Sequence, residues 1–168
     1  MSTGAPILVG CTNDAVWVKV EGKGSFLNST GLKEFTREML GRGHREFVID
    51  LRNCPVMDST FMGTLAGVAL RLREIGQGHV RVTNLNERNS DLLSNLGLDR
   101  LFAMGDGDVT PGEQIPQTKL DGTETSGREQ TARTMLDAHE ALVKADAGNL
   151  TKFKDCLEYL REDLHRGE

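Results

Sequence analysis

The first 105 residues alternate short apolar runs with segments of helical periodicity, and this alternation constrains the fold more than any other feature of the chain. Strands are predicted where a run is continuously apolar or alternates with period two, at residues 7–11, 16–20, 47–51 and 80–83. Leu101 and Phe102 are expected to form a last edge strand. The turn pair Asn13-Asp14 predicts that the first two strands form a hairpin.

Three helices are predicted between these strands, because apolar side chains recur three and four residues apart behind residues that favour helix ends. The first is expected to start at the cap residues 28–30 and to end at Gly41. The second runs from near Asp58 to Ile75, and the third from the cap Asn86 to Gly97. The resulting order, β-β-α-β-α-β-α-β, predicts an α/β fold in which helices flank a mixed sheet.

The composition changes near residue 105. Residues 1–105 carry a net charge of +1, whereas residues 106–168 carry −6. The segment that joins the two regions is rich in glycine and proline, and its few apolar residues stand singly, so it cannot bury enough surface to stay ordered. We therefore predict a domain at 1–104, a flexible linker at 105–127 and an acidic helical extension at 128–168.

The extension carries two apolar stripes at helical spacing. They are out of phase with each other, which predicts two helices that meet near Gly148 and Asn149 rather than one straight coiled coil. The stripes consist of Met135, Ala138, Leu142 and Ala145, and then of Leu150, Phe153, Leu157, Leu160 and Leu164. Two arrangements stay open at this point: packing against the same chain, or a homodimer through these helices.

Several classes of protein are disfavoured by composition. No apolar run reaches the roughly 18 residues of a membrane helix, and the amino terminus lacks a secretory signal pattern, so we expect a cytoplasmic protein without membrane insertion. Three widely spaced cysteines disfavour a disulfide scaffold. A net charge of −5 with 5% aromatic residues disfavours nucleic-acid binding. The four histidines are scattered, so no metal or other cofactor is expected.

One segment carries functional content: a buried strand leads through a loop to Asp58, Ser59 and Thr60 at the start of the second helix. An ordinary cap at Asp58 would explain this pattern without any function. A serine in the first turn is nevertheless expected to point outward, where a phosphate would meet free N–H groups at the positive end of the helix dipole. Modification would then change what the surface binds while the helix stays folded.

Other candidate sites are weaker. No histidine stands near Ser59 in the sequence and no Gly-x-Ser-x-Gly motif is present, so an enzyme is not expected. His139 is predicted to lie on a solvated helix face. Residues 22–27 contain Gly-x-Gly between a strand and a helix, but without the third glycine a plain turn is favoured over a nucleotide site. Gly63 and Gly67 are predicted to allow close helix–sheet packing, with a partner interface as the alternative.

The segment 47–102 resembles a STAS domain, the module of bacterial anti-sigma-factor antagonists. The resemblance rests on Asp50-Leu51, on Met57-Asp58-Ser59-Thr60, on Gly63-Thr64-Leu65, on Val82-Thr83-Asn84-Leu85 and on the stretch 96–102. It implies a four- to five-stranded sheet flanked by helices, with Ser59 as the phosphoacceptor. It further implies that the unphosphorylated protein binds an anti-sigma factor that is a serine kinase, and that an opposing phosphatase reverses the modification.

The sequence differs from the family pattern at two places. Phe61 stands where the family usually has glycine, which places an aromatic ring either at the switch surface or buried under the sheet. The loop after the second strand, residues 22–26, carries Lys23 where the family has an acidic loop. We expect a partner-binding surface around Ser59, made of Lys23, Ser25, Asp58, Thr60, Phe61 and Met62. The alternatives are a constitutive STAS scaffold and a small regulatory subunit of a transport ATPase.

Overall fold

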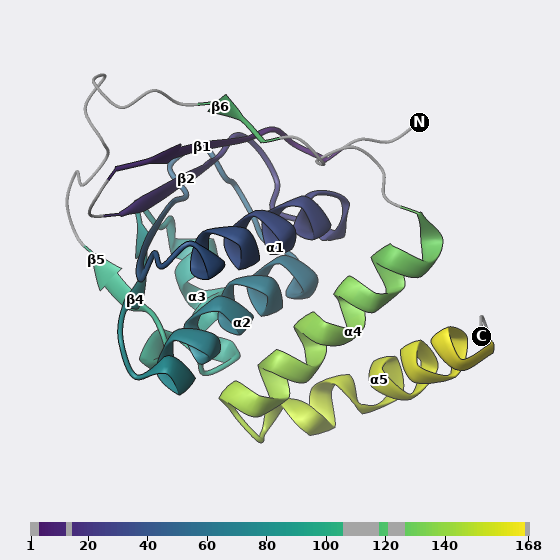
Figure 1. Ribbon diagram of the computed structural model, residues 1–168. Helices are drawn as coiled ribbons and strands as arrows, with labels where there is room; N and C mark the ends of the chain where they lie inside the picture. The colour runs from purple at the N-terminus through teal and green to yellow at the C-terminus, as the bar shows by residue number, and fades with distance from the viewer. Residues whose placement is uncertain (1–3, 13–14, 106–117, 121–126, 167–168) are drawn as a thin grey trace.

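The computed structural model describes residues 4–12, 15–105, 118–120 and 127–166 and contains a six-stranded sheet with helices on one side (Figure 1). The strand order is β5-β4-β3-β2-β1-β6. Strand β1 pairs antiparallel with β2 and β6, and the pairs from β2 to β5 are parallel. The strands are β1 (Ile7–Cys11), β2 (Val16–Val20), β3 (Glu46–Asp50), β4 (His79–Thr83), β5 (Ala103–Gly105) and β6 (Thr118–Lys119).

The helices are α1 (Phe26–Gly41), α2 (Ser59–Ile75), α3 (Glu87–Asn95), α4 (Arg128–Ala145) and α5 (Asn149–Arg166), with a short 3-10 helix at Leu98–Arg100. The predicted starts of α2 and α3 are confirmed, because Asp58 and Asn86 accept hydrogen bonds from first-turn amides, and α3 ends at Asn95, before the predicted Gly97. Gly76 ends α2 in the left-handed region, at φ 84°, where glycine is favoured.

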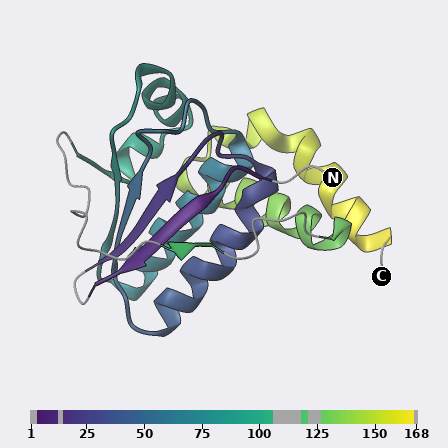
Figure 2. The same ribbon diagram turned by 90° about the horizontal axis from the view of Figure 1, so that it is seen from above.

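The main core lies between the sheet and the pair α1 and α2. The valines of β2 are buried, whereas Trp17 and Lys19 on its other face are half-buried. Residues 47–50 of the central strand β3 are all buried. Figure 2 shows α1 and α2 on one face of the sheet, with α4 and α5 outside them. The predicted mixed α/β architecture is therefore confirmed.

Three elements differ from the sequence prediction. Helix α1 begins at Phe26, because Ser25 is the N-cap and Asn28 completes a capping box with it. The last strand of the domain is Ala103–Gly105, since Leu101 and Phe102 close the 3-10 helix with amides bonded to the Leu98 carbonyl. The sheet also gains a sixth strand, because Thr118–Lys119 pairs with β1.

The two predicted C-terminal helices are confirmed, and they pack against the same chain. Helix α4 crosses α1 and α2, and α5 packs back on α4 (Figure 1). At their junction the Asn149 side chain donates to the carbonyls of Leu96 and Leu142, at 3.0 and 2.7 Å, which fixes the turn against α3. Most of the predicted linker lies outside the described residues. None of the helices in the described ranges is long and apolar enough to span a membrane.

Candidate functional site

Asp58 ties together the amino ends of α1 and α2. One carboxylate oxygen accepts from the amide of Phe61 at 2.9 Å and the other from the amide of Phe26, also at 2.9 Å. Just before it, Gly24 and Met57 form a β-bridge, and the Asp58 amide donates to the Gly24 carbonyl at 2.8 Å. Two loops far apart in the sequence are thereby joined, and Ser59 stands as the first residue of α2 at their junction.

We expect Asp58→Ala to lower the free energy of unfolding by about 1–3 kcal/mol, because it removes an N-cap and leaves a second amide without its acceptor. Asp58→Asn is the matched control, since its amide oxygen can still accept from Phe61. It should fall between the wild type and Asp58→Ala in urea unfolding. Equal losses for the two variants would contradict a role for the first-turn cap.

Ser59 is held by a histidine from α4. Its hydroxyl oxygen lies 2.9 Å from Nε2 of His139, and Nδ1 of that ring lies 2.6 Å from the carbonyl oxygen of Met135. A carbonyl can only accept, so Nδ1 carries the proton, and in the neutral ring Nε2 accepts from the Ser59 hydroxyl. Ser59 is half-buried rather than freely exposed.

His139 corrects two expectations. It is 3% exposed, and its ring packs edge-on against Phe153 of α5 with the ring centroids 4.9 Å apart, so the predicted solvated face is wrong. It also places a histidine beside Ser59, although 80 positions separate the two in the sequence. One feature of the sequence indicates that His139 is buried: it lies four residues after Met135, on the side of α4 that carries the weaker apolar stripe.

The other residues of the predicted partner surface are largely inside the molecule. Ser25, Thr60, Phe61 and Met62 are buried, and Lys23 is exposed. The ring of Phe61 lies against Gly24, and a β-carbon added to Gly24 would come within 2.7 Å of the ring. Of the two positions expected for Phe61, at the switch surface or buried, the buried one is therefore correct. In this conformation the accessible part of the predicted surface consists of Lys23 and the half-buried Asp58 and Ser59.

The two glycines of α2 face α4 and not the sheet, contrary to the helix–sheet packing predicted for them. A β-carbon built on Gly63 would lie 2.2 Å from the carbonyl oxygen of Ala138, which no real contact allows. One built on Gly67 would meet its nearest neighbour, the Ala141 β-carbon, at 4.0 Å. Gly63 is therefore a point of close approach between the backbones of α2 and α4, one turn after Ser59.

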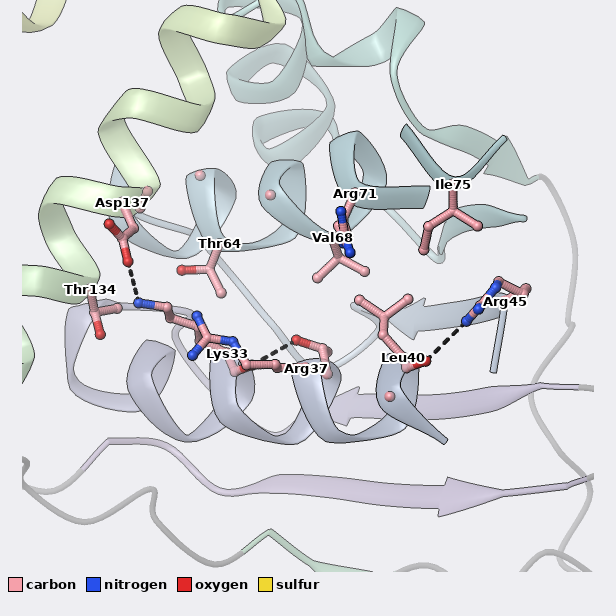
Figure 3. Close-up of a pocket in the computed structure, with 15 residues that line it drawn as sticks. Lys33, Arg37, Leu40, Arg45, Thr64, Val68, Arg71, Ile75, Thr134 and Asp137 are labelled. Atoms are coloured by element: carbon pink, nitrogen blue, oxygen red, sulfur yellow. Dashed lines mark hydrogen bonds and ion pairs between the residues drawn. The ribbon is translucent and has the colours of Figure 1, made fainter. Parts of the chain in front are cut away.

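A groove of about 660 Å³ opens beside this crossing, between α1 and α2 (Figure 3). Its cationic side chains are Lys33, Arg37, Arg45 and Arg71, and its apolar lining includes Leu40, Val68 and Ile75. Asp137 of α4 reaches Lys33 at one end, as Figure 3 shows. Guanidinium and ammonium groups suit acidic groups, so this lining favours carboxylates or phosphates. The sequence prediction missed the groove, because its residues come from three separate helices and from the loop before β3.

The remaining candidates offer little chemistry. Within the described parts of the chain, His, Cys, Asp and Glu side chains form no group of three that could hold a metal ion. The three cysteines are free thiols, and burial raises the pKa of Cys54 and of Cys156, which keeps them protonated. The glycine-containing loop after β2 is a turn, with Gly22 at φ 136°.

The mixed sheet, the pair of helices on one face and the capped serine at the start of the second helix define a small α/β module with one distinctive surface. Residues 7–111 match the STAS domain, and the chain belongs to this family. Helices α4 and α5 lie outside the matched residues. No curated protein sequence matches the chain.

Solved structures show the same fold. A Thermotoga maritima protein assigned as an anti-sigma factor antagonist is 21% identical, covers 59% of this chain and 85% of its own, and has a TM-score of 0.55. The anti-sigma factor antagonist SpoIIAA in its unphosphorylated form is 15% identical over 62% of this chain and 90% of its own, with a TM-score of 0.51. The phosphorylated form of the Bacillus cell-fate determinant SpoIIAA is 16% identical over 62% and 93%, with a TM-score of 0.53.

Proposed function

We propose that this protein is a phosphorylation-switched binding regulator of the anti-sigma factor antagonist type. In this proposal it binds a serine-kinase anti-sigma factor in the cytoplasm while Ser59 is unphosphorylated, and it acts by binding rather than as an enzyme. The observation that carries the proposal is the position of Ser59 as the first residue of α2, directly after its N-cap Asp58. The likeness in fold to both forms of SpoIIAA supports it.

The chemistry of the switch follows from this position. A kinase transfers the terminal phosphoryl group of ATP to the Ser59 oxygen, the hydroxyl proton leaves and ADP is released. The phosphate adds a charge of about −1.5 to −2 at the positive end of α2, where the helix dipole favours it. The fold is thus retained while the binding surface changes its charge and shape. An opposing phosphatase removes the group by hydrolysis and restores the hydroxyl.

We expect the serine-kinase anti-sigma factor of this proposal to add one phosphate, which mass spectrometry of the peptides should place on Ser59. Ser59→Ala should abolish the modification, whereas Ser94→Ala, which alters an exposed serine of α3, should leave it unchanged. In a pull-down, Ser59→Asp should bind the kinase at least about tenfold more weakly than Ser59→Ala, since an added charge opposes docking.

Two results would contradict the switch: phosphate on a residue other than Ser59, or equal partner binding by Ser59→Asp and Ser59→Ala. Equal binding would instead favour the constitutive scaffold. Capture of a transport ATPase in the same pull-down would favour the regulatory-subunit alternative.

A further inference from the structure

Helix α4 already occupies the surface around Ser59. Besides the bond from Ser59 to His139, the hydroxyls of Thr30 in α1 and Thr134 in α4 lie 2.9 Å apart and are both buried. Lys33 of α1 pairs with Asp137 at the edge of the groove. Helix α4 therefore covers the amino-terminal half of α1 and lies along α2 from Ser59 to Glu74, where Lys144 pairs with Glu74, so it covers the part of the domain that presents the switch serine (Figures 1 and 2).

The two faces match in shape, polarity and charge. Gly63 lets the α4 backbone approach α2 without a side chain between them, and Leu142 of α4 is fully buried in the main core of the domain. Each buried polar group named at this interface has a partner from the opposite side or from its own helix. Such complementarity is typical of a specific, well-packed interface and not of a helix that is only loosely attached to a surface.

From these contacts we infer that the Ser59 face is a helix-docking surface, that α4 is its resident occupant in the same chain, and that α4 must leave before a kinase or a binding partner can engage Ser59. The inference deepens the proposed function and rests on it for the role of Ser59. The docked helix and the external partner then compete for one surface, and the fraction of chains with α4 released limits partner binding.

Phosphorylation disfavours the docking of α4 for two reasons. When His139 is neutral, its Nε2 accepts the hydrogen bond from the Ser59 hydroxyl, and phosphorylation removes the proton of that bond. The ring of His139 is also buried between Ser59 and Phe153, so a phosphoryl group added to the Ser59 oxygen would crowd a contact that is only 2.9 Å long. Because coupling is reciprocal, whatever releases α4 also makes Ser59 available.

The contacts of α4 also specify the kind of partner that can replace it. The partner must offer a helix with a small residue opposite Gly63, as Ala138 is, and a carboxylate toward Lys33, as Asp137 is. The other three cationic side chains of the adjacent groove are Arg37, Arg45 and Arg71 (Figure 3). They extend the preference for acidic groups to the part of the surface next to α4.

The test compares Gly63→Ala with Gly67→Ala in the full-length chain. Both changes improve the helix propensity of α2 equally. The new β-carbon at position 63 would collide with the Ala138 carbonyl, whereas the one at position 67 would make an ordinary contact. Gly63→Ala should therefore lower the hydrogen-exchange protection of the α4 amides by on the order of tenfold or more, while Gly67→Ala should not, and protection of β3 should stay unchanged in both.

A second pair of variants tests the link to Ser59. Ser59→Glu places a bulky charged group against His139, and Ser59→Ala removes the hydrogen bond without adding volume. Ser59→Glu should lower α4 protection about as much as Gly63→Ala, and clearly more than Ser59→Ala. Equal α4 protection in Gly63→Ala and Gly67→Ala, or wild-type protection in Ser59→Glu, would overturn the inference. A chain that releases α4 as expected but receives no phosphate on Ser59 would instead refute the phosphorylation switch alone.

Discussion

Replacement of Phe61 by alanine should lower the free energy of unfolding by about 3–5 kcal/mol, a large fraction of the stability of an ordinary domain. The ring is fully buried and fills the space between α2 and the loop that precedes α1. Alanine would keep the helix and leave a cavity beside Gly24, directly under the residues that position Ser59. Urea unfolding followed by circular dichroism measures the loss.

Phe26→Ala serves as the control, because Phe26 is 42% exposed and its truncation should cost little. A double-mutant cycle sharpens the test. Gly24→Ala should destabilise the wild type, since its β-carbon would come within 2.7 Å of the Phe61 ring, and it should be better tolerated in Phe61→Ala, where the ring is absent. If the losses in free energy of unfolding are additive in the cycle, residues 24 and 61 are not in steric conflict, which would contradict the expectation.

Leu142→Ala should cost about 2–5 kcal/mol and should loosen the C-terminal helices before the sheet. Among the buried residues described in the main core, Leu142 alone comes from beyond residue 105, and it is 0% exposed. Its side chain therefore anchors α4 to the domain. Hydrogen exchange should show the largest loss of protection in α4 and α5, with β3 and β4 affected less.

Leu150→Ala is the matched control, because this leucine of α5 is 49% exposed and leaves no cavity when truncated. The control should unfold at nearly the same urea concentration as the wild type. A cost for Leu142→Ala no larger than that of Leu150→Ala would mean that α4 is not anchored through the core.

Local sequence signals determined the elements that carry the site. The start of α2 at Ser59 follows from Asp58, whose side chain satisfies a first-turn amide, and the end follows from Gly76 in the left-handed region. The valines of β2 alternate because one face of that strand is buried and the other is not. The break between α4 and α5 follows from two stripes that cannot face the same side of one helix. These features depend on neighbours a few positions apart, which the sequence shows directly.

The tertiary structure alone decided what surrounds Ser59. His139 reaches the serine because α4 folds back over α2, and nothing within a few residues of His139 specifies that crossing. Gly63 became a point of close approach between two helices, and Phe61 became part of the core, only once the loop at Gly24 and helix α4 had been placed. Such contacts join segments that are distant in the chain, so they depend on how complementary faces pack and not on any local pattern.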